Sequence, residues 1–242
     1  MKKAIGIVFV FFLLVFFSCA PVYVPNTRNA ALFRGAGEFQ SSIHFGEGID
    51  AQAAVSITNH IGLMGNYNYV NRNTSDQNDE DKYVKHKFWE AAAGYYENTG
   101  KICYEIFGGY GRGEGSSYGN YLWFSPDDVL AKGTYGRFFV QPSIGSNNNI
   151  FNWIVSTRIS YVDFEKFTYG TQVATYNNPV LFFEPAFTGR INFGQSPIYS
   201  QFQTGFSLTT QGDTVFDYQP FQLSFGLGLR LGGKPKATVQ QP

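Results

Sequence analysis

The sequence predicts an all-β protein, an antiparallel up-and-down transmembrane β-barrel of about ten strands with long outer loops and short periplasmic turns. Composition is the first observation: of 242 residues, 18% are aromatic, 27 are Gly and only 15% are charged. Large aromatic side chains and glycine turns are typical of β-structure. The second is a period of two in apolar residues that recurs from residue 35 to residue 231. The third is an alternation of short and long connections between these segments.

The charge balance excludes some partners. Lys plus Arg equals Asp plus Glu, at 18 each, so no basic excess is present to neutralise phosphates and we expect no nucleic-acid partner. The aromatic content also excludes a disordered chain. We expect no cofactor.

The N-terminus has the pattern of a secretory signal. Lys2 and Lys3 precede an apolar run, residues 4–17, which ends at Ser18-Cys19. A small residue followed by Cys resembles a bacterial lipobox, although Phe16 stands where Leu is usual. We therefore predict a lipoprotein signal peptide over 1–18 and lipidation of Cys19, against the alternative of an uncleaved anchor.

The mature chain divides into three parts. We predict a lipidated extended linker over 19–34, a barrel domain over 35–231 and a polar C-terminal tail over 232–242. The predicted strands are 35–45, 48–58, 61–71, 86–97, 101–112, 133–145, 150–163, 179–193, 197–209 and 220–231. The linker contains two prolines and no period.

The connections predict the orientation of the chain. Long polar connections are expected at 72–85, 113–132, 164–178 and 210–219, and short turns between the other strands. An even number of strands places both ends of the barrel domain on the short-turn side. We therefore expect an outer-membrane protein whose lipid lies in the periplasmic leaflet, so that membrane lipid is one partner.

The alternation also predicts which face meets lipid. Phe151, Val155 and Ile159 share one face of a strand whose other face carries Ser156 and Arg158. A soluble sandwich or lipocalin-like barrel would turn the apolar face inward. The charges on the polar face favour the transmembrane barrel, because eight charges in an apolar core would be costly. This predicted lumen charge network comprises Glu38, Glu90, Glu105, Glu184, Arg137, Arg158, Arg190 and Arg230.

Glycine and proline add two expectations. Inward glycines are expected to make room for the long Arg side chains; they are Gly94, Gly109, Gly111, Gly205, Gly226 and Gly228. Pro142 and Pro185 fall inside predicted strands and lack a donor, so we expect a bulge or a strand break at each.

Several short stretches carry a family resemblance. They are Val24-Pro25-Asn26, residues 37–40 (GEFQ), 50–54 (DAQAA), 58–64 (TNHIGLM) and 107–111 (FGGYG). From Cys19 to Leu231 the chain resembles a family of Bacteroidetes outer-membrane β-barrel lipoproteins of unknown function. The resemblance implies an outer-membrane barrel with no assigned chemistry. The polar tail after Leu231 departs from barrels that end on a terminal aromatic residue.

Candidate chemistry is sparse. His44 or His86 near the long-loop rim, with Asp127, Asp128 or Ser116, would be the elements of base-activated nucleophilic attack, but solvated rim residues are the preferred interpretation. His60 is expected to be structural. The acidic stretch 75–82 has carboxylates suited to Ca²⁺ but lacks the spacing of a known loop, and a solvated loop is preferred. We predict no enzyme, no catalytic residue and no metal site.

The preferred function is therefore a structural or accessory envelope component whose lumen is plugged by charges. Tyr118, Tyr121, Trp123 and Phe124 in the expected long loop predict a contact with an envelope protein or a glycan. The alternatives are a surface enzyme acting on lipid or protein, and a small-solute channel.

Overall fold

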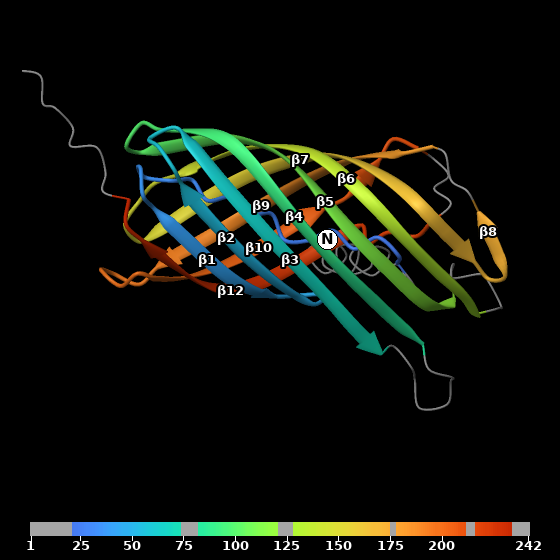
Figure 1. Ribbon diagram of the computed structural model, residues 1–242. Coiled ribbons are helices and arrows are strands. Elements are labelled where there is room, and N and C mark those ends of the chain that lie inside the picture. The colour runs from blue at the N-terminus through green and yellow to red at the C-terminus, as the bar shows by residue number, and fades with distance from the viewer. Residues whose placement is uncertain (1–20, 74–81, 121–127, 175–177, 212–215, 234–242) are drawn as a thin grey trace, which may run out of the picture.

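The computed structural model describes residues 21–73, 82–120, 128–174, 178–211 and 216–233, and ten of its strands close into an antiparallel barrel (Figure 1). Around the ring the order is β1, β2, β3, β4, β5, β6, β7, β9, β10, β12 and back to β1. The bounds are β1 Phe39–Phe45, β2 Ile49–Ser56, β3 Ile61–Asn73, β4 Tyr83–Asn98, β5 Ile102–Asn120, β6 Asp128–Ser146, β7 Phe151–Tyr169, β9 Val180–Asn192, β10 Ile198–Phe206 and β12 Phe221–Leu231. The predicted fold class and all ten predicted strands are confirmed.

Two short strands lie outside the ring. β8 (Gln172–Ala174) pairs with the end of β7, and β11 (Leu208–Thr209) pairs with β9 beyond β10. The barrel is sealed by β1 and β12, which run from Phe39↔Leu231 to Phe45↔Phe225. Both β1 and β12 therefore meet the short-turn end, as predicted. Within the described ranges, no helix is long and apolar enough to cross a membrane.

The strands on one side of the barrel are much longer than predicted. β5, β6 and β7 have 19 residues each, whereas β1 has 7 and β2 has 8. The expected long connection 113–132 is therefore mostly strand, because β5 continues to Asn120 and β6 begins at Asp128. Apolar alternation ends where a strand leaves the lipid, but backbone pairing continues, and this is why periodicity underestimated the strands.

The outer wall is apolar and the predicted assignment of faces is confirmed. Phe45, Phe138 and Leu227 expose about 60% of their surface (60%, 61% and 62%) on the outside. Towards the long-loop end the wall carries aromatic residues, with Trp89 and Tyr110 in edge contact at 6.3 Å and Tyr110 and Phe138 at 4.8 Å. An apolar band bordered by aromatic residues is typical of outer-membrane barrels. The soluble alternative, with the apolar face inside, is wrong.

The glycine expectation is corrected. The space above inward glycines is taken by rings, not by Arg side chains: a Cβ at Gly94 would lie 2.6 Å from Phe107, and one at Gly228 would lie within 2.6 Å of Tyr199. Other glycines accommodate the N-terminal residues, since a Cβ at Gly62 would lie 2.5 Å from the Phe33 ring. Aromatic side chains therefore fill much of the interior.

The two prolines interrupt ladders without changing the register. Pairing between β6 and β7 skips Pro142, and pairing of β9 stops between β10 and β11 opposite Pro185. The expected bulge or strand break is therefore corrected: β6 and β9 each continue through their proline, and the pairing is interrupted with one neighbouring strand only. The register shift in β6 lies elsewhere, between Thr134 and Tyr135.

The largest departure from the sequence-based expectation concerns the residues before β1. The linker expected over 19–34 is extended in its described part, but residues 21–33 are buried inside the barrel instead of lying outside it. In Figure 1 this blue trace runs along the inside of the ring of strands. We call residues 21–34 the plug segment.

Candidate functional site: the filled lumen

The plug segment crosses the barrel from the long-loop end to the short-turn end. At the long-loop end, the Val22 amide donates to the Asp217 carbonyl (2.9 Å), and Tyr23 forms a parallel bridge with Tyr218. At the other end, Arg34 Nε donates to Asn147 Oδ1 in the turn between β6 and β7 (3.0 Å). The chain therefore turns back at β1, and the described N-terminal end lies opposite the short turns.

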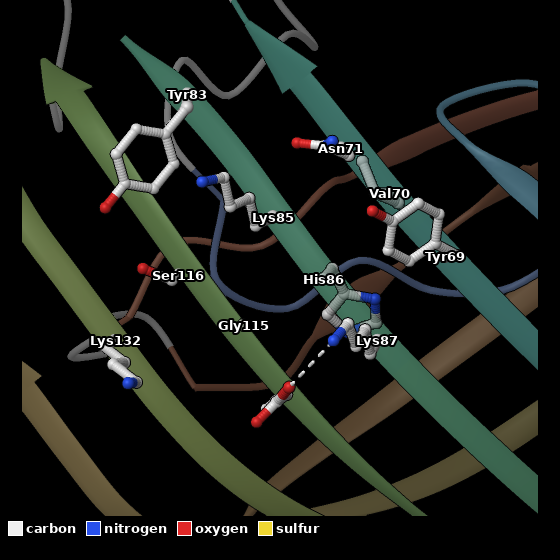
Figure 2. A pocket seen from close by; sticks show the side chains of 11 residues that line it. Tyr69, Val70, Asn71, Tyr83, Lys85, His86, Lys87, Gly115, Ser116 and Lys132 are labelled. Atoms are coloured by element: carbon white, nitrogen blue, oxygen red, sulfur yellow. Dashed lines mark ion pairs between the residues drawn. The ribbon is translucent and has the colours of Figure 1, made fainter. Parts of the chain in front are cut away.

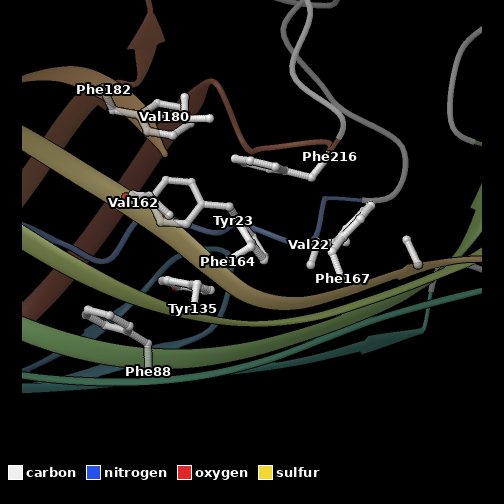
Figure 3. Packing of buried hydrophobic residues seen from close by; sticks show 11 residues of the cluster. Val22, Tyr23, Phe88, Tyr135, Val162, Phe164, Phe167, Val180, Phe182 and Phe216 are labelled. Carbon is white, nitrogen blue, oxygen red and sulfur yellow. The ribbon is translucent and has the colours of Figure 1, made fainter. Parts of the chain in front are cut away.

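An apolar layer surrounds the first residues of the plug segment. Tyr23 stacks on Phe182 with 4.9 Å between ring centroids and meets Tyr135 edge-on at 5.4 Å. Figure 3 shows these rings converging on Tyr23 from several strands. The buried members of this upper layer are Val22, Tyr23, Phe88, Ala131, Tyr135, Val162, Phe164, Phe167, Val180, Phe182 and Phe216. Burial of so much aromatic surface fixes the segment at the long-loop end.

A charged layer lies below it, and Asn26 is at its centre. Asn26 Nδ2 donates to Glu90 Oε1 (2.9 Å), while its Oδ1 accepts from Arg137 (2.6 Å) and Arg158 (2.9 Å). Glu90 also pairs directly with Arg137 at 2.5 Å and with Arg158 at 3.2 Å. All three charged side chains are fully buried. The guanidinium groups stack on rings, with Arg137 4.1 Å from Phe88 and Arg158 4.5 Å from Phe139.

Glu184 forms a second centre in this layer. It accepts a hydrogen bond from the Tyr23 hydroxyl (3.1 Å) and one from Ser160 (2.7 Å), and Arg28 Nη2 lies 3.9 Å away. Arg28 also donates to Gln222 Oε1 (3.0 Å). Tyr23 in turn accepts from Arg137 (2.9 Å). The Tyr23 hydroxyl therefore connects the upper layer directly with Glu184 and, through Arg137, with Glu90.

Near the short turns, charged side chains of the wall bind the backbone of the plug segment. The Leu32 amide donates to Glu105 (2.9 Å), and Arg190 donates to the Ala30 carbonyl (3.0 Å). Leu32 is the one described non-glycine residue with positive φ, at 46°. Because a positive φ is unfavourable for any residue with a side chain, the contacts around Leu32 must impose this backbone conformation.

All eight charges of the predicted network face the interior, but they do not simply pair with one another. Glu90 pairs with Arg137 and Arg158, and Glu38 pairs with Arg230 at 3.0 Å. Glu105 and Arg190 instead bind the plug segment. Sequence reasoning missed Tyr23, Asn26 and Arg28, because an extended chain buried on all sides has no period.

The two candidate rim histidines are buried. His86 contacts Asn68 (2.8 Å) and the Tyr135 hydroxyl (2.7 Å), and His44 contacts Ser42 (3.0 Å) and Gln201 (2.7 Å). The expectation of solvated rim residues is wrong for both. Ser116 follows Gly115, the partner of His86, and so points to the opposite, outer face. His60 pairs with Glu97 at 2.9 Å in a turn.

The structure describes only some of the other candidate residues. Tyr118 lies in β5 and stacks on Tyr83 at 6.3 Å. Cys19, Tyr121, Trp123, Phe124, Asp127 and most of the acidic stretch 75–82 lie outside the described residues, and so does the side chain of Asp128. Within the described ranges, no group of three or more His, Cys, Asp or Glu residues is placed to hold a metal ion.

Comparison with known proteins assigns no family. No family model matches the chain, and no curated protein matches it. Among solved structures, it is similar to "Outer-membrane expressed OmpT of Vibrio cholerae", with a TM-score of 0.26 and 8% identity over 81% of this chain and 96% of the other. A loop L8 deletion mutant of the same Vibrio cholerae protein has a TM-score of 0.23 at 10% identity, covering 81% of this chain and 97% of that one.

Proposed function

We propose that this protein is a lipid-anchored outer-membrane barrel that acts as a structural or accessory component of the envelope and whose lumen is closed by its own N-terminal segment. The observation that carries the proposal is the plug segment, buried from residue 21 to residue 33. Its contacts lie on every side of the ring, from Glu90 on β4 to Gln222 on β12. A passage for solutes would require this segment to leave.

Conductance in planar bilayers tests the closed lumen. The folded full-length protein should give no current steps above those of the bare bilayer. Deletion of residues 21–33 should open a steady conductance, provided that the variant still shows a shift in gel mobility on heating, as folded barrels do. Steady conductance of the unaltered protein would overturn the proposal, whether or not the deletion variant folds.

The course of the plug segment supports a different leaflet from the one the strand count predicts. Pro21 lies at the long-loop end, and two residues of chain reach at most about 7 Å. In barrels of this class the long loops face outward. We therefore place the lipid of Cys19 in the outer leaflet, and the C-terminus on the periplasmic side where β12 ends.

Two epitope tags separate these arrangements. A tag inserted after Ala20 should be detected by antibody on intact cells, whereas a tag added after Pro242 should be detected only after permeabilisation. The reverse pattern would restore the periplasmic leaflet. Intact-mass measurement of the mature chain should show residue 19 as the first residue with added acyl mass, and an unmodified chain would remove the lipid anchor from the proposal.

The proposed partner is an envelope protein or a glycan at the long-loop end. Because β5 and β6 pair as far as Asn120↔Asp128, only residues 121–127 connect them. Replacing this connection with Gly and Ser should abolish partner recovery by cross-linking and leave the heat-dependent gel shift unchanged. Equal recovery would remove this loop from the contact.

A further inference from the structure

The outer wall of the barrel carries a basic hollow above the aromatic residues. It has a volume of about 420 Å³ and lies over β3, β4, β5 and β6. Figure 2 shows Lys85, Lys87 and Lys132 around it, and the dashed line at Lys87 marks its ion pair, whose partner is Glu114. Three ammonium groups thus face one carboxylate, and the Lys87–Glu114 pair is loose, at 3.9 Å with both side chains more than half exposed.

The register arranges these side chains in a row. Lys85 on β4 pairs with Ser116 on β5, and Ser116 pairs with Lys132 on β6. The three side chains therefore share the outer face, with a hydroxyl between two ammonium groups whose strands are about 10 Å apart. Lys85 Nζ lies 4.7 Å from the Tyr83 ring. Among the described residues neither Lys85 nor Lys132 has an ion-pair partner.

A second hollow continues the first towards the membrane. It has a volume of about 280 Å³, shares Lys87 and Glu114 with the basic hollow, and is lined by Tyr67 and Trp89. Trp89 is four residues from Lys85 along β4, or about 13 Å. A basic site therefore lies directly above an aromatic one at the border of the apolar band. This order matches an amphiphile with an anionic head and an apolar body.

We propose that the two hollows together form a groove that binds a phosphate-bearing lipid of the leaflet at the long-loop end. Lys85 and Lys132 hold the phosphate from either side, and the Ser116 hydroxyl donates to it between them. The lipid body lies along Tyr67 and Trp89. Basic groups placed at the depth of lipid headgroups are a general means of selecting anionic lipids.

The test measures lipid retained by the full-length protein from vesicles made of equal parts phosphatidylcholine and phosphatidylglycerol. After extraction in mild detergent, native mass spectrometry should show bound phosphatidylglycerol in preference to phosphatidylcholine. The double variant Lys85→Gln/Lys132→Gln should lower this preference roughly 25-fold, at about fivefold for each lysine. Ser116→Ala should lower it less, because one neutral hydrogen bond is lost.

A matched control removes the same charge elsewhere. Lys101 lies in a short turn and Lys166 on β7, and neither lines either hollow. The double variant Lys101→Gln/Lys166→Gln should keep the preference. Equal retention of both lipids by the unaltered protein, or equal loss in the two double variants, would overturn the proposal. Displacement of the lipid by millimolar inorganic phosphate would assign the groove to a soluble phosphate instead.

Discussion

The upper layer and the charged layer below it hold the same segment by different physics. Tyr23 is fixed among rings, where the stabilisation grows with the apolar area removed from water. Asn26, three residues further along, is fixed by charged groups that no water reaches. Packing is additive and tolerant of small changes, whereas a buried charge network fails when one member is removed. Removal of a carboxylate should therefore cost more than removal of a ring.

The largest effect is expected in the charged layer. Glu90→Leu leaves Arg137 and Arg158 buried without a carboxylate and should lower the free energy of unfolding by about 4 kcal/mol. Urea titration followed by the heat-dependent gel shift measures this. Glu97→Gln, which weakens partly exposed contacts with His60 and Tyr95, should cost less than about 1 kcal/mol. Similar costs for the two variants would contradict the comparison.

A somewhat smaller loss is expected in the upper layer. Phe182→Ala removes the ring that stacks on Tyr23 and should cost about 3 kcal/mol. Phe182→Leu should cost less than about 1.5 kcal/mol, because packing accepts another apolar side chain of similar size. A substitution by Leu as damaging as the one by Ala would show that this layer is not governed by packing.

Near the short turns, the fit of the plug segment can be tested by adding one methyl group. Gly62→Ala places a Cβ 2.5 Å from the Phe33 ring and should cost about 2 kcal/mol. Gly65→Ala on the same strand is the matched control, since its Cβ would meet no atom closer than 3.7 Å. If both variants unfold at the same urea concentration as the parent, the segment does not pack here as described.

The smallest effect should come from the link between the layers. Tyr23→Phe keeps the ring but removes the hydroxyl that donates to Glu184 and accepts from Arg137. The loss should be about 1 to 2 kcal/mol, because one partner is charged in each bond. The double variant with Phe182→Ala should show non-additive losses in the same urea titration. Strict additivity would mean that the layers act independently.

The sequence predicted the wall of the barrel much better than its contents. In β7, Phe151 and Ile159 face outward, and Ser156 and Arg158 face inward, as expected. The alternation predicts this because successive side chains of a strand point to opposite faces, one apolar and one polar. The inward direction of Glu90 and Arg137 follows from the same alternation. Their partner Asn26 could not be found in this way, since every residue from 22 to 33 is buried and no face repeats. Arg28 stands in a run of four polar residues, 26–29, which has the composition of a solvated linker and gives no sign of burial.

The course of the plug segment also constrains the order in which the protein is assembled. The segment precedes β1, yet Thr27 contacts Ser224 on β12, 197 positions later, and Arg28 contacts Gln222. These contacts can therefore form only once β12 has been made, so the plug segment is not fully held until the rest of the described chain is present. Because these contacts join the two ends of the described chain, they close a very long loop, and slow folding is the expected consequence.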